Sequence, residues 1–252
     1  MIHTETANHI QRIEIRRAEK KNALTQDMYV ALKAALEKAS ADAGVRVVLL
    51  TGAPGIFCSG NDIADFLAHP IRDEDAPVLR FLRTLINFEK PIVAGVAGMA
   101  VGIGTTMLLH CDYVVASEDA QFSTPFANLG LCPEAGSSLM LPLAIGHKRA
   151  SEMLLFGDRV PAATMLDWGL VNTVVPNDKL VEVVEARAKT LSMKPPSALI
   201  AAKRLLRRTL APAATQAMGI EAKEFGSLLQ SPAAEECLAA FVQKRLPDPA
   251  KF

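Results

Sequence analysis

The spacing of apolar residues changes from strand-like to helix-like over the first fifty positions. Residues 10–15 place three isoleucines among polar residues, as in a strand with one buried face. Between residues 28 and 39 apolar residues recur at helical spacing, behind Thr25, whose residue type often caps helices. Residues 45–51 form a short apolar run. We therefore expect a strand, a helix and a buried strand in that order.

The same alternation continues through the middle of the chain. Residues 91–97 and 112–117 have the composition of strands, and residues 104–110 that of a buried helix. The nearly uncharged stretch 92–109 is long enough to raise the question of a membrane span. Four glycines interrupt it and Pro91 opens it, which favours a strand, a turn and a helix. We expect an α/β fold with helices covering the sheets, and no membrane span.

The last quarter of the chain consists almost entirely of helix-forming residues, and prolines separate the expected helices. We expect a core over residues 1–195 and a helical region over residues 196–252. Apolar side chains on these helices require a partner surface, either the chain's own core or another subunit. The positions concerned are Leu199, Leu205, Leu206, Phe225, Leu228 and Leu238.

Charge and composition exclude several classes of function. The 252 residues carry 27 Lys and Arg against 27 Asp and Glu, which argues against a nucleic-acid-binding protein. The four cysteines and five histidines are scattered without metal-ligand spacing, so we expect no metal and no cofactor. The N-terminus lacks a signal-peptide core and the C-terminus lacks a peroxisomal S-K-L address. The expected location is a reducing compartment, by default the cytoplasm.

Two glycine-bearing segments lie where a strand leads into a helix. In residues 57–62, Gly60 permits close approach of the backbone to a ligand, and Asn61 presents its amide near a short helix. In residues 98–106, glycines expose backbone amides at a helix N-terminus. The second segment is neither a dinucleotide-binding fingerprint nor a P-loop. Each segment taken alone is equally typical of a plain turn.

A third segment, residues 125–138, contains a carboxylate among apolar residues. Glu134 follows a proline and precedes small residues. A carboxyl group in such surroundings has a raised pKa and can act as a base near neutral pH. The alternative is structural, with Glu134 capping the helix expected to begin near Gly136.

Taken together and in this order, the three segments resemble the crotonase superfamily. Residues 21–24, 162–176 and 241–245 extend the resemblance over nearly the whole chain. It implies a spiral of repeated ββα units followed by C-terminal helices that build trimers, often paired into hexamers. It also implies an acyl-CoA thioester as substrate. The backbone N–H groups of Asn61 and Ile103 would bind the thioester oxygen.

Departures from the family pattern bear on the reaction. Enoyl-CoA hydratases carry glutamates at the positions occupied here by Thr106 and Phe126. Glu134 instead falls where Δ3,Δ2-enoyl-CoA isomerases keep their single base, and the neighbouring residues look most like the peroxisomal-type branch. The resemblance therefore favours a double-bond isomerase of fatty acid degradation over a hydratase.

The resemblance also suggests which residues contact the substrate. Lys20 and Lys244 are candidates that equally suit plain surface charge. The full set of expected CoA and acyl contacts is Ser59, Gly60, Asp62, Ile63, Phe66, Phe126, Leu131, Lys20, Phe241 and Lys244. Two alternatives remain. One is another crotonase-type acyl-CoA enzyme, such as a hydratase, ring-opening isomerase, dehalogenase or thioesterase. The other is a catalytically weak acyl-CoA- or RNA-binding relative, against which the balanced charge and Glu134 both count.

Overall fold

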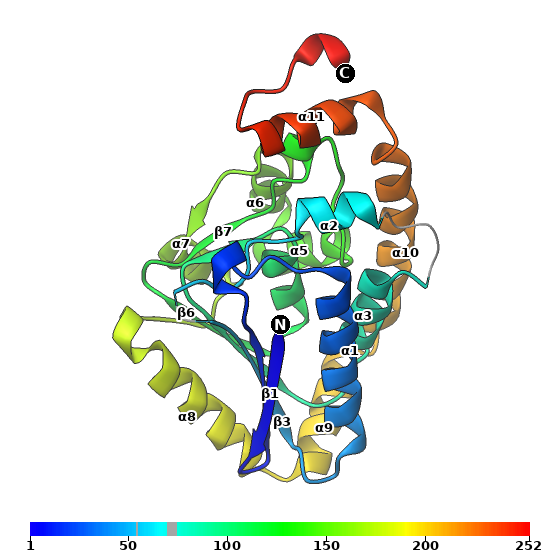
Figure 1. Ribbon diagram of the computed structural model, residues 1–252. Helices are drawn as coiled ribbons and strands as arrows, with labels where there is room; N and C mark the ends of the chain where they lie inside the picture. The colour runs from blue at the N-terminus through cyan, green and yellow to red at the C-terminus, as the bar shows by residue number, and fades with distance from the viewer. Residues whose placement is uncertain (54, 70–74) are drawn as a thin grey trace.

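Six strands form the larger of two sheets, in the order β1-β2-β3-β4-β6-β9. The computed structural model describes residues 1–53, 55–69 and 75–252, and Figure 1 shows the arrangement of its elements. The β1–β2 pair is antiparallel, and every later pair in this sheet is parallel. The strands are β1 (Ile2–Ala7), β2 (Ile10–Ile15), β3 (Val47–Gly52), β4 (Ile92–Val96), β6 (Tyr113–Ser117) and β9 (Thr173–Val175).

The parallel part of this sheet is covered on both faces. Val48 and Leu50 of β3 belong to the core that also holds helices α1 (Gln26–Ala41) and α3 (Pro77–Ile86). The alternate residues Val47 and Leu49 pack with the buried side chains of α8 (Leu180–Ser192). Because side chains alternate between faces, a strand buried on both sides is apolar without interruption. This explains the continuous apolar run expected at residues 45–51.

A smaller three-stranded sheet brings two of the glycine-bearing segments together. Its order is β5-β7-β8, with β5 (Met99–Val101), β7 (Gln121–Ser123) and β8 (Val160–Pro161). Cys58 of the first segment forms an isolated bridge with Ala100 of β5. The chain then enters the short helix α4 (Ile103–Thr106). Thr105 fastens this helix through its hydroxyl, which donates to the carbonyls of Ala100 at 2.6 Å and Ser123 at 3.1 Å.

Most elements expected from the sequence are present. The helix begins at Gln26, and the Thr25 hydroxyl accepts a hydrogen bond from the Met28 amide. The long apolar stretch is divided among β4, β5, α4 and a 3₁₀ turn, Met107–His110. No helix in the described part of the chain is long and apolar enough to cross a membrane. Strand β1 was not predicted, because it is a largely exposed edge strand with little apolar character.

The C-terminal region is helical, as expected, and only some of its apolar side chains pack against the rest of the chain. Helix α10 (Leu210–Leu228) packs against α5 (Ser137–Ile145) and α3, and it runs beside α3 in Figure 1. Phe225 and Leu238 are buried, whereas Leu205 and Leu206 are 64% and 77% exposed. The three helices are α9 (Pro196–Arg207), α10 (Leu210–Leu228) and α11 (Pro232–Gln243).

The remaining elements are short connections between these layers. They are η1 (Ala18–Lys20), α2 (Ile63–Ala68), η3 (Ala127–Leu129), α6 (His147–Ser151), the π-helical η4 (Glu152–Phe156), α7 (Ala162–Trp168), η5 (Asn177–Lys179) and η6 (Pro249–Lys251).

Candidate active site

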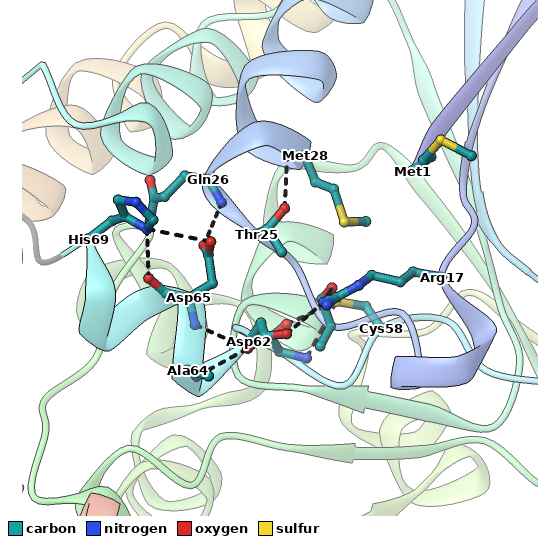
Figure 2. Close-up of polar contacts among 12 residues, drawn as sticks. Met1, Arg17, Thr25, Gln26, Met28, Cys58, Asp62, Ala64, Asp65 and His69 are labelled. Carbon is teal, nitrogen blue, oxygen red and sulfur yellow. Dashed lines mark hydrogen bonds and ion pairs between the residues drawn. The ribbon is translucent and has the colours of Figure 1, made fainter.

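The loop before α2 is held in place by polar contacts of Asp62. One carboxylate oxygen accepts hydrogen bonds from the amides of Ala64 and Asp65 at the start of the helix. The other pairs with the guanidinium of Arg17 at 2.8 Å, and Figure 2 shows these contacts converging on one side chain. Gly60 has a φ of +96°, a conformation that favours glycine. Asp62 therefore fixes the shape of this loop, and its side chain does not line the cavity described next.

A cavity of about 350 Å³ lies between this loop, α4 and the C-terminal helices. Its lining includes nine of the twelve residues expected to bind the substrate or to form the oxyanion hole. Those residues are Ser59, Gly60, Asn61, Ile63, Phe66, Ile103, Phe126, Leu131 and Phe241. Lys20 and Lys244 are exposed outside this lining, and Arg245, which the sequence did not indicate, contributes to it. A cavity of this size with mostly apolar walls suits a small-molecule ligand.

Two residues that line this cavity have backbone amides without a hydrogen-bond acceptor in the described structure. Asn61 lies just before α2, and Ile103 is the first residue of α4, where N–H groups have no partner within the helix. Both residues line the cavity, and neither amide donates a hydrogen bond to any described residue. Free donors at a helix start favour an anionic oxygen. The family resemblance predicts that these two amides form an oxyanion hole.

Glu134 lies in a second, smaller cavity that adjoins the first. The two cavities share Asn61, Phe66 and Phe225 in their linings. Glu134 is the only carboxylate that lines either of them in the part of the chain that the structure describes. One oxygen of Glu134 accepts a short hydrogen bond from the hydroxyl of Thr106.

The surroundings of Glu134 disfavour its charged form. Burial raises the pKa of Glu134 to about 8, the hydrogen bond from Thr106 opposes the rise, and the negative charge of Glu221 adds to it. A carboxyl group with such a pKa is a usable base at neutral to slightly alkaline pH. Glu134 does not cap α5, because the cap is provided by Glu221, whose carboxylate accepts from the amides of Gly136 and Ser138.

Three contributions to the site were missed from the sequence. The hydroxyl of buried Tyr29, on α1, donates to the side-chain oxygen of Asn61. Phe225, on α10, joins Phe66, Phe126 and Leu131 in one apolar cluster, although it is distant from all three in the sequence. Thr106 was noted only as a missing glutamate, although its hydroxyl could have indicated a hydrogen-bond donor.

Comparison with known proteins identifies the family of this chain. A family model described as enoyl-CoA hydratase/isomerase matches residues 5–250. The chain belongs to this family. Its fold also matches a crystal structure of an enoyl-CoA hydratase/isomerase from Pseudoalteromonas atlantica T6c, with a TM-score of 0.93, 38% identity and 98% of both chains covered. The expected α/β crotonase fold, with two sheets and C-terminal helices, is therefore confirmed.

Relatives within the enoyl-CoA hydratase/isomerase family carry names of both reaction types. Enoyl-CoA delta isomerase 2 of Rattus norvegicus is 41% identical over 205 residues, which cover 79% of this chain and 52% of that protein. The 2,3-dehydroadipyl-CoA hydratase of Escherichia coli K12 is 33% identical over 240 residues, which cover 94% of this chain and 93% of that protein. The chain thus spans about half the length of the rat isomerase and nearly all of the bacterial hydratase.

Proposed function

We propose that this chain is an acyl-CoA double-bond isomerase that converts Δ3-enoyl-CoA into Δ2-trans-enoyl-CoA, with Glu134 as its only base. The observation that carries the proposal is a single carboxylate in cavities that are also lined by two residues whose backbone amides have no acceptor in the described structure. Glu134 is the only acidic residue in the described lining of the two cavities, and its pKa is raised to about 8. The similarity to enoyl-CoA delta isomerases supports the same assignment.

The reaction follows from these groups. The thioester oxygen accepts hydrogen bonds from the amides of Asn61 and Ile103, which stabilise the enolate formed when Glu134 removes a proton from C2. Each such donor contributes roughly 3 kcal/mol to transition-state stabilisation. Glu134 then returns the proton at C4, the double bond moves from C3–C4 to C2–C3, and no atom is gained or lost. The Thr106 hydroxyl orients the Glu134 carboxylate by donating to one of its oxygens.

A hydratase is the second candidate, because relatives with that name match almost the full chain. Adding water requires groups that hold and deprotonate the water molecule. The positions of the two hydratase glutamates hold Thr106 and Phe126, and neither can supply a carboxylate. The absence of that carboxylate pair favours isomerisation. Other crotonase-type reactions on acyl-CoA remain within the same family.

One experiment separates these reactions. Purified protein is incubated in parallel with a 3-enoyl-CoA and a 2-enoyl-CoA, and the products are identified by mass and by ultraviolet absorbance of the conjugated thioester. Isomerisation predicts conversion of the first substrate without a change in mass and no hydration of the second. A product of the second that is heavier by one water would identify a hydratase, and free CoA would identify a thioesterase.

A further inference from the structure

The turn that carries Glu134 is fastened by a second glutamate from a distant helix. The carboxylate of Glu221, on α10, accepts the amide of Gly136 at 2.6 Å and the amide of Ser138 at 2.8 Å. It also accepts the hydroxyl of Ser138 at 2.5 Å. Glu221 is only 6% exposed, and it forms no ion pair with any described residue. Three donors from one turn thus satisfy a buried, unpaired carboxylate.

This turn has an unusual backbone that requires such support. Ala135 and Gly136 have φ values of +62° and +72°, and a non-glycine residue such as Ala135 rarely adopts this conformation. Helix α5 begins directly after them and has no capping side chain from its own sequence. The Glu221 carboxylate occupies the place of that cap and lies near the positive end of the helix.

A buried histidine holds the opposite side of the same turn. Nε2 of His110 lies 2.7 Å from the carbonyl oxygen of Ala135, which can only accept a hydrogen bond. Its Nδ1 lies 3.1 Å from the guanidinium of Arg207, which can only donate. The ring is therefore neutral with its proton on Nε2, and burial agrees with this by lowering the pKa of His110 to about 4. Glu221 and His110 together leave the turn little freedom.

We propose that Glu221 is a positioning residue for the reaction, which fixes the turn bearing Glu134 and acts on Glu134 through the field of its negative charge. The inference rests on the proposed function in one respect, namely that Glu134 is the base. It adds a residue that touches neither cavity and that the sequence did not indicate.

The electrostatic part depends on what else faces Glu134. Tyr29 from α1, Cys58 from the loop before α2 and Cys132 from the turn itself all interact with it. Burial raises the pKa of each of these three groups, so each is neutral near pH 8. Glu221 is the charged group that raises the pKa of Glu134 within the described structure. Removing this charge should make Glu134 easier to ionise.

The test compares Glu221→Gln with Glu224→Gln. Glu224 is exposed on the same helix, so its variant removes an equal charge without disturbing the turn. The two backbone amides donate to different oxygens of Glu221, and glutamine would present an NH2 donor at one of these two positions. We expect Glu221→Gln to lower kcat about 10- to 100-fold with little change in KM, the scale of a misplaced catalytic group. We also expect the acidic limb of its pH profile to move to lower pH. Glu224→Gln should keep the wild-type kcat and the wild-type pH profile.

A merely structural Glu221 would give a different result. Glu221→Gln would then melt at lower temperature, but the folded enzyme would keep the wild-type kcat and pH profile, and the proposal would be overturned. If Glu221→Gln does not fold, Ser138→Ala decides the positioning part. This variant removes one hydrogen bond and keeps the charge, so kcat should fall severalfold while the pH profile stays in place. A wild-type kcat in Ser138→Ala would contradict the proposal.

A direct titration separates failure of this inference from failure of the proposed isomerase activity. Carbon-13 NMR follows the glutamate side-chain carboxyl groups with pH, and the signal missing in Glu134→Gln assigns Glu134. A lower Glu134 pKa in Glu221→Gln than in wild type and in Glu224→Gln supports the inference even if no isomerisation occurs. An unchanged Glu134 pKa rejects the electrostatic part even if the enzyme is an isomerase.

Discussion

The raised pKa of Glu134 makes a quantitative prediction about the pH dependence of catalysis. A base must be ionised to accept a proton, and burial places the pKa of Glu134 at about 8 instead of its ordinary 4.5. Below that pH the ionised fraction falls about tenfold for each pH unit, to roughly a tenth at pH 7 and a hundredth at pH 6. We therefore expect kcat/KM for a 3-enoyl-CoA to rise with a slope near one from pH 6 to pH 8 and then level off.

Substitution of Thr106 changes the pKa of Glu134 in a second, independent way. Its hydroxyl donates to the Glu134 carboxylate and opposes the rise in pKa caused by burial. Thr106→Val keeps the shape of the side chain and removes the donor, so the pKa of Glu134 should rise further. The acidic limb of kcat/KM should move to higher pH, and activity at pH 7 should fall more than activity at pH 9.

The assay is initial-rate absorbance of the conjugated product between pH 5 and 10, with circular dichroism at each pH to confirm folding. Thr84→Val is a matched control, because that threonine is partly exposed on α3 and its hydroxyl donates to a carbonyl within its own helix. A kcat/KM that is flat from pH 6 to 9 in the wild type would refute the raised pKa. A limb near pH 4.5 would show that the Glu134 carboxyl is solvated in the free enzyme.

Further predictions concern Glu134 itself, the two oxyanion donors and the oligomeric state. Glu134→Gln should lower turnover roughly 100-fold or more while acyl-CoA binding measured by calorimetry changes little. Its melting temperature should exceed that of wild type at pH 9 but not at pH 4, because an acid whose pKa is raised in the folded state loses its stabilising contribution between about pH 4.5 and 8. Ile103→Pro removes one oxyanion donor and should lower kcat at least ~100-fold. Asn61→Ala keeps its backbone amide and should retain much of the activity. This variant should be less stable than the wild type, because the buried hydroxyl of Tyr29 loses its hydrogen-bond acceptor. A stable 27 kDa monomer in light scattering at micromolar concentration would contradict the assembly expected from exposed Leu206.

The sequence by itself determined the elements and the candidate chemistry. The spacing of apolar residues located the strand at residues 10–15, the Thr25-capped helix and the buried strand after it. Elements buried on one face and elements buried on both faces differ in the spacing of their apolar residues. The glycine-bearing junctions indicated amides close to helix starts, and the resemblance to the crotonase superfamily assigned them to Asn61 and Ile103. The apolar neighbours of Glu134 indicated a raised pKa.

Only the tertiary structure decided which distant residues complete the site. Thr106 and Glu134 are 28 positions apart, and Glu221 reaches Gly136 across 85 positions, so no local pattern relates them. Glu134 and Glu221 both lie among apolar or small residues in the sequence, yet one lines a cavity and the other caps a helix. Burial depends on which surfaces meet after folding, and the pKa of a carboxyl group depends on that burial and on its neighbours in space. The roles of the two glutamates therefore became distinguishable only once α10 was seen packed against α5.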